Sequence, residues 1–187
     1  TVTVDGGAAE PMTTAGPGVT AELTYAIPQG TLANGAHTLA ISATDSLGNV
    51  GDPVTVTIYV DQNGPVVDDA SVRLSPNPNN GHQSWTPDDF QARVDASATD
   101  SDPTAGVASG MAAAEGWFDR CGDPGTGARL EAKDGVFDEP TEAVYASIPL
   151  VQIRALAPNQ THRFYIRARD QAGNWGACSN PGTNPGD

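Results

Sequence analysis

Two segments of the chain carry nearly the same sequence, "AHTLAISATDSLGNVG" at 36–51 and "THRFYIRARDQAGNWG" at 161–176. In each copy apolar and polar residues alternate until an Asp-x-x-Gly-Asn sequence follows, at 45–49 and at 170–174. An alternation with period two predicts a half-buried antiparallel strand, and Asp, Gly and Asn in such a place are typical of a hairpin turn. We therefore expect each copy to form the last hairpin of a domain, and the chain to hold two domains in tandem.

The composition is that of an all-β protein. Val, Ile, Thr and Ala supply most of the strand-like positions, and 21 Gly and 15 Pro residues separate them at short intervals. β-Branched residues favour strands, and Gly and Pro favour turns. The longest helix-compatible segment, 108–119, is interrupted by Gly110 and Gly116. The expected fold class is therefore all-β.

The charge and the motifs exclude several classes of function. The formal net charge is −14, from 23 acidic and 9 basic residues, and such a surface repels nucleic acid. No apolar run approaches the about 20 residues of a membrane helix, so we expect no membrane insertion. The three histidines, His37, His82 and His162, are dispersed, and no nucleophile elbow, zinc-protease helix or phosphate loop is present. We expect no enzymatic activity.

The repeated phrases "GAHTLAISATDSLGN" and "QTHRFYIRARDQAGN" resemble the final strands of bacterial immunoglobulin-like and fibronectin type III-like modules. Two further segments resemble other strands of these modules, "TVTVDGG" at 1–7 and "AAEGWFDRCGDPGTG" at 113–127. The resemblance covers about half the chain and implies two tandem immunoglobulin-like β-sandwiches of an extracellular bacterial protein. It implies little about a ligand, since this fold supports many unrelated functions.

The resemblance places the domain boundary at "DQNGP", 61–65. Residues 1–62 are expected to be the C-terminal part of one immunoglobulin-like domain, with strands at 1–4, 20–27, 37–44 and 53–60. Because this fold needs seven strands, we expect the opening strands of the first domain to be missing and its apolar face to invite pairing with another chain. Residues 63–187 are expected to be a complete domain with a flexible tail from about residue 180. Its strands are expected near 71–75, 90–98, 113–120, 129–133, 143–149, 162–169 and 175–179.

The two cysteines, Cys121 and Cys178, both lie in the second predicted domain. A secreted composition favours a disulfide between them. The bridge requires Cα atoms within about 7 Å. Since the two residues are expected at opposite ends of their strands, the strand at 113–120 must be short or shifted.

One face of the second domain combines aromatic and basic side chains. The strands at 113–120 and 162–169 are expected to be neighbours, so that aromatic rings stack on each other or on guanidinium groups while Glu115 and Asp119 pair with arginines. One interpretation is a cross-strand ladder that shields the sheet, and the other is a binding face for a protein or glycan ligand. The residues of this face are Trp117, Tyr165, Arg163, Arg167 and Arg169.

The sequence also predicts a calcium site at the joint between the domains. Calcium takes about six to eight oxygen ligands from carboxylates, amides and carbonyls. The arrangement resembles the interdomain calcium sites of cadherins, although the linker lacks a second Asp. The alternative is that these residues cap turns without metal. The same Asp-x-x-Gly-Asn sequence at 45–49, at the far end of the first domain, favours this turn role. The predicted ligands are Asp61, Asn63, Asp100, Asp102, Asp170 and Asn174.

Two hypotheses for the function remain open. The first is a non-catalytic spacer or adhesive and recognition segment of a larger bacterial surface or secreted protein, with the neighbouring domains as partners. The alternative is an accessory substrate-binding module of a secreted protease or glycosidase. Exposed, unpaired aromatic residues on the Trp117 face favour the binder, whereas aromatic residues covered by arginine favour the spacer. Trp85, in a predicted loop, offers a second aromatic platform or folds back as a plug.

Overall fold

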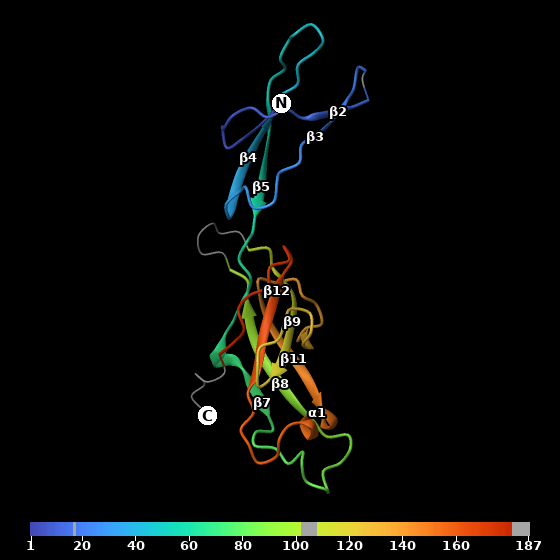
Figure 1. Cartoon of the computed structure of the whole chain (residues 1–187), viewed down its shortest axis with the longest axis vertical. Helices are drawn as coiled ribbons and strands as arrows, with labels where there is room; N and C mark the ends of the chain where they lie inside the picture. Colours follow the sequence, from blue (N-terminus) through green and yellow to red (C-terminus); the bar gives the residue numbers. More distant parts are fainter. Residues whose placement is uncertain (17, 102–107, 181–187) are drawn as a thin grey trace. The chain divides into compact units, whose positions relative to one another are not determined.

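The computed structural model describes residues 1–16, 18–101 and 108–180. The regular structure of these residues is almost entirely β-strand, which confirms the all-β prediction. They form two compact units, residues 1–62 (unit 1) and the described residues from 63 onward (unit 2) (Figure 1). In the described ranges, no helix has the length and apolar character needed to cross a membrane.

Unit 1 contains a three-stranded antiparallel sheet in the order β1–β4–β5. Strand β4 (Gly35–Ile41) and strand β5 (Val54–Val60) form the hairpin expected from the first repeated segment, and β1 (Val2–Val4) pairs with the other edge of β4. Strands β2 (Thr13–Ala15) and β3 (Glu22–Thr24) form a separate exposed hairpin. The strand expected at 20–27 is therefore shorter, and its partner was not foreseen.

One face of the β1–β4–β5 sheet is apolar, and its β5 edge is exposed at Val54 and Val56. Val4 pairs with Leu39 and Leu39 pairs with Val56, so the three side chains share a face. Val56 is 45% exposed and Val54 is 65% exposed, whereas Val2 is 1% exposed. Within the described part of unit 1, no second sheet covers this face. That the first domain lacks its opening strands stays a prediction.

Unit 2 contains seven strands that are hydrogen-bonded in the order β12–β9–β10–β11–β8–β6, with β7 also beside β8. Strand β10 changes partner along its length, because its first residues pair with β9 and its last two with β11. A short 3₁₀ helix, Asp69–Ser71, and the helix α1, Leu150–Ala155, were not predicted. The strands are β6 (Val66–Val67), β7 (Arg73–Ser75), β8 (Gln91–Thr99), β9 (Met111–Phe118), β10 (Ala128–Ala132), β11 (Thr141–Pro149) and β12 (Phe164–Asp170).

The core of unit 2 collects residues from both ends of this strand order. Alternate residues of β8, β11 and β12 are buried, as the period-two pattern requires. Val94 on β8, Leu130 on β10 and Ile166 on β12 are completely buried and belong to one cluster. Strands far apart in the hydrogen-bonded order therefore share a single core.

The strand expected at 175–179 is not formed as a regular strand in the described residues. The segment still runs beside β12, where the Gly176 amide donates to the Ala168 carbonyl at 3.0 Å and the Ser179 amide donates to the Ile166 carbonyl at 2.7 Å. The carbonyl of Pro65 lies where a side chain at Gly176 would begin, so the segment packs backbone against backbone. The tail beyond residue 180 lies outside the described residues.

Candidate functional site

A cavity of about 380 Å³ lies beside α1 in unit 2. Its walls come from the β7–β8 connection and from the segment that runs from α1 to β12. The base is apolar, with Ala92 1% and Ile153 4% exposed, and Phe118 and Leu156 beside them. The cavity therefore joins a buried apolar surface to loop residues that face solvent.

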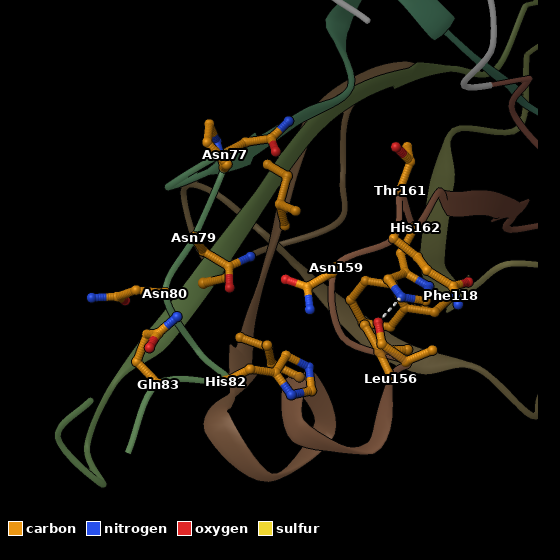
Figure 2. Close-up of a pocket in the computed structure, with 16 residues that line it drawn as sticks. Asn77, Asn79, Asn80, His82, Gln83, Phe118, Leu156, Asn159, Thr161 and His162 are labelled. Carbon is orange, nitrogen blue, oxygen red and sulfur yellow. Dashed lines mark hydrogen bonds between the residues drawn. The ribbon is translucent and has the colours of Figure 1, made fainter. Parts of the chain in front are cut away.

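The polar lining of the cavity is rich in side-chain amides. Figure 2 shows Asn79 and Asn159 extending into the cavity from opposite walls. No Asp, Glu, Lys or Arg residue is among the described residues that line it. The amide, hydroxyl and imidazole side chains of the lining are Asn77, Asn79, Asn80, His82, Gln83, Asn159, Gln160, Thr161 and His162.

A tight turn holds the amides of the β7–β8 connection against α1. The Asn79 side chain accepts a hydrogen bond from the Gly81 amide at 3.0 Å, and the Thr86 hydroxyl donates to the Asn80 carbonyl. A Cβ atom at Gly81 would lie 2.5 Å from Ile153 Cγ2, so only Gly lets the turn approach this closely. Arg154 donates to the Gly81 carbonyl at 3.3 Å. The cavity wall is therefore held by contacts between side chains and the backbone of this turn.

His162 closes one side of the cavity through two hydrogen bonds. Its Nδ1 lies 2.7 Å from Asp119 Oδ2, and its Nε2 lies 2.7 Å from the Ala157 carbonyl oxygen. Both partners are acceptors, so the ring donates from both nitrogens only when it is protonated. The Ala157 carbonyl and the Asp119 carboxylate accordingly raise the pKa of His162.

Unit 1 repeats this arrangement with the residues at equivalent places. His37 Nδ1 lies 2.6 Å from Asp5 Oδ2, and Nε2 lies 2.8 Å from the Ala33 carbonyl. Asp5 follows β1 as Asp119 follows β9, and both adopt left-handed backbone angles, with φ of 51° and 62°. The Asp5 carboxylate and the Ala33 carbonyl raise the pKa of His37. We call the Asp–His–carbonyl arrangement of each unit its histidine clamp.

The two histidine clamps predict that the protein is more stable in mild acid than in mild base. A folded-state pKa above the ordinary 6.5 gives stability that is complete below that value and is lost as pH rises through the raised pKa. We expect the melting temperature to fall from about pH 5.5 to about pH 8.5.

The double variant H37Q/H162Q should lose most of this dependence of the melting temperature on pH. His82→Gln is the control, since His82 makes no ring hydrogen bond among the described residues. An equal pH dependence in the double variant would contradict the role of the clamps.

The predicted Trp117 face is assembled on β9 and β12. Tyr165 pairs with Trp117 across the strands, and the Arg167 guanidinium lies 5.9 Å from the Trp117 ring centroid. Arg169 lies 5.6 Å from the ring of Trp175. Arg163 is exposed at the start of the row. The structure therefore brings four of the five predicted residues onto two neighbouring strands, with Arg163 directly before β12.

The loop that follows β9 covers the Trp117 ring. Cβ atoms at Gly122 and Gly127 would lie 2.4 and 2.8 Å from indole atoms, so both glycines pack directly against the ring. The indole N–H donates to the Thr126 hydroxyl at 3.2 Å. Glu115, 5% exposed, accepts hydrogen bonds from amides of the same loop. The expectation that Glu115 pairs with an arginine is therefore wrong, because its carboxylate holds the loop instead.

The same loop resolves the geometry of the predicted disulfide. Because the chain folds back after β9, Cys121 reaches the segment beside β12 and bonds to Cys178, with Cα atoms 6.2 Å apart. Arg167 also donates to the Cys121 sulfur at 3.2 Å. The Cys121–Cys178 disulfide is confirmed.

Of the predicted calcium ligands, unit 2 brings three together. Carboxylate oxygens of Asp100 and Asp170 lie within 4.8 Å of each other, and the two residues are 2% and 1% exposed. The Asn174 side chain donates to Asp170 Oδ2 at 2.8 Å. Asn63 opens unit 2 next to Gly64, whose Cβ position is 2.3 Å from the Gly176 amide nitrogen. Asp61 belongs to unit 1, and Asp102 lies outside the described residues.

The oxygen atoms of this cluster are suitable ligands for calcium. They also accept the backbone hydrogen bonds that stabilise the turn. Asp170 Oδ1 accepts from the Asn174 amide at 2.7 Å, as Asp45 Oδ1 accepts from Asn49 at 2.9 Å in unit 1. Asp45 is exposed, however, whereas Asp170 is buried beside a second carboxylate. Two buried carboxylates at this separation repel each other, and a cation bound between them removes this repulsion.

Calcium binding is the prediction that follows for this cluster. Calcium should raise the melting temperature above its value in chelator. At a free calcium concentration about 100 times the dissociation constant, the free energy of unfolding should increase by about 2.7 kcal/mol. Asp100→Asn should remove the calcium effect, because it removes one charge while keeping an oxygen that accepts from the Gly110 amide. Asp45→Asn, at the matching turn of unit 1, should leave it unchanged. Identical melting curves with calcium and with chelator would contradict the site.

No family model, curated protein or solved structure matches the chain. Function is therefore inferred from its residues and their geometry alone.

Sequence reasoning did not find the cavity. Two sequence features could have indicated its polar lining. One is the group Asn77, Asn79 and Asn80, and the other is the "APNQT" segment at 157–161. Asn and Pro are also the ordinary residues of turns, so neither signal indicates a ligand before the two loops are known to meet. The sequence allowed Trp85 either to be exposed or to fold back against the domain. The side chain is 68% exposed, so it does not fold back.

Proposed function

We propose that the chain is a non-catalytic spacer of a larger extracellular protein, built from tandem immunoglobulin-like β-sandwich units. The histidine clamps and the Asp-x-x-Gly-Asn turns recur at equivalent places in both units, which supports a repeated module. A disulfide persists in oxidising compartments, so Cys121–Cys178 supports an extracellular location. Neighbouring domains of a longer chain are the partners that such a spacer requires.

The observation that carries this proposal is the packing around the Trp117 ring, which is only partly exposed. An aromatic residue that binds a polymer must present its ring to solvent, whereas Trp117 is overlaid by Gly122 and Gly127 and flanked by Arg167. The ring, the loop and the disulfide therefore fasten β9 to β12 and to the chain beyond it. Fastening of this kind suits a segment that holds other domains apart.

The spacer proposal predicts a structural effect at Trp117 and none at Trp85. Trp117→Phe should lower stability by about 1–2 kcal/mol, because the hydrogen bond to Thr126 and part of the packed ring are lost. Trp85→Phe is the matched control on an exposed ring. Thermal unfolding and retention on insoluble cellulose and chitin are measured together. If Trp117→Phe lost retention with an unchanged melting temperature, this face would be a binding surface and the spacer role would be wrong.

An accessory substrate-binding module of a secreted hydrolase is the second candidate function. The Trp117 face does not favour it, but the amide-lined cavity at the α1 end of unit 2 does.

A further inference from the structure

We infer that the amide-lined cavity of unit 2 binds a neutral glycan. The first ground is the state of its amides. Within the described residues, no side-chain hydrogen bond engages Asn77, Asn80, Gln83, Asn159 or Gln160. Each carboxamide offers two donors and an acceptor. A ligand that supplies many donors and acceptors of its own, as the hydroxyl groups of a sugar do, satisfies such a lining.

The second ground is that the lining of the cavity holds no Asp, Glu, Lys or Arg among the described residues. The chain has 23 acidic and 9 basic residues, yet none of them is among the described lining residues. His162 is the exception when protonated, and its charge is balanced by Asp119 at 2.7 Å. A phosphate or a carboxylate finds no Lys or Arg in this lining, and Ca²⁺ or Mg²⁺ finds no carboxylate. The fitting ligand is therefore uncharged.

The third ground is the apolar surface beside the amides. Sugar rings have an apolar C–H face, and they pack it on aromatic and aliphatic side chains while their hydroxyls bond at the edge. Phe118 and Leu156 supply such a surface within the cavity. A volume of about 380 Å³ lies in the range of small-ligand sites.

The test is a titration of the whole chain with cellotriose, maltotriose and the trimer of N-acetylglucosamine, followed by ¹⁵N NMR. We expect at least one sugar to shift the side-chain NH₂ signals of Gln83 and Asn159. Asn159→Ala should weaken binding about two- to tenfold. Gln152→Ala is the matched control, since this exposed amide lies on α1 outside the cavity.

Three results would overturn the inference, provided that melting curves show the variants folded. No shift with any of these sugars at about 10 mM is the first. Tighter binding of a charged glycan such as polygalacturonate is the second. The third is binding of an unstructured peptide at these amides with no sugar binding. The inference does not depend on the spacer role, because cavity variants leave Trp117 and the disulfide intact.

Discussion

Replacing Gly176 with Ala is expected to destabilise unit 2 by about 3 kcal/mol or more. A Cβ atom at this position would lie 1.7 Å from the Pro65 carbonyl oxygen and 2.8 Å from its carbon. These are backbone atoms of the segment that enters unit 2, so no side-chain rotation relieves the overlap. Gly64, in the same segment, packs equally closely against the backbone of Trp175 and Gly176. The two segments must therefore separate, and the hydrogen bond from Gly176 to Ala168 is strained with them.

Gly51→Ala is the matched control, because Gly51 holds the same position in the repeated sequence of unit 1. The nearest atom to a Cβ there is the Ala43 carbonyl oxygen at 3.7 Å, an ordinary contact. We expect its effect on chemical denaturation to stay within about 0.5 kcal/mol. Equal losses in the two variants would show that the glycines serve the turn alone and that Pro65 does not pack as described.

Removing the Cys121–Cys178 disulfide is expected to cost about 4 kcal/mol, the second large effect. The bridge closes a loop with a sequence separation of 57 residues. Without the bridge, the unfolded chain regains the entropy that closing this loop removes. In the loop-entropy model this entropy is worth about 4 kcal/mol. It also frees the loop that covers Trp117.

The double variant C121A/C178A tests this by urea denaturation with and without reductant. Wild type in reductant should match the double variant, and reductant should not change the variant. A midpoint for the variant that equals oxidised wild type would show that the loop is held by Glu115 and Trp117 without the bridge.

The sequence predicted the parts of the fold that depend on neighbouring residues. The β4–β5 hairpin follows from alternation and from the turn at Asp45, both of which are local signals. The partner change of β10 and the absence of a regular strand at 175–179 depend on contacts between distant segments. No periodicity encodes such contacts, and they were missed.

The candidate sites divide in the same way. The pairing of Cys121 with Cys178 and the sharing of a face by Trp117 and Tyr165 followed from residue types and strand register. The histidine clamps could not be predicted in this way, although His37 and His162 occupy equivalent positions in the repeated sequence. Their partners follow β1 and β9, and only the pairing of those strands with β4 and β12 brings each Asp to its His.

Pulling single molecules of the whole chain from its two ends tests the spacer role most directly. A spacer must hold its length under load, so unit 2 should stay folded until it opens in one step. After reduction that step should lengthen by about 190–205 Å, the extended length of the 57-residue separation that the disulfide closes. A chain that lengthens gradually at low force, or a step of the same length in oxidised and reduced protein, would contradict the account.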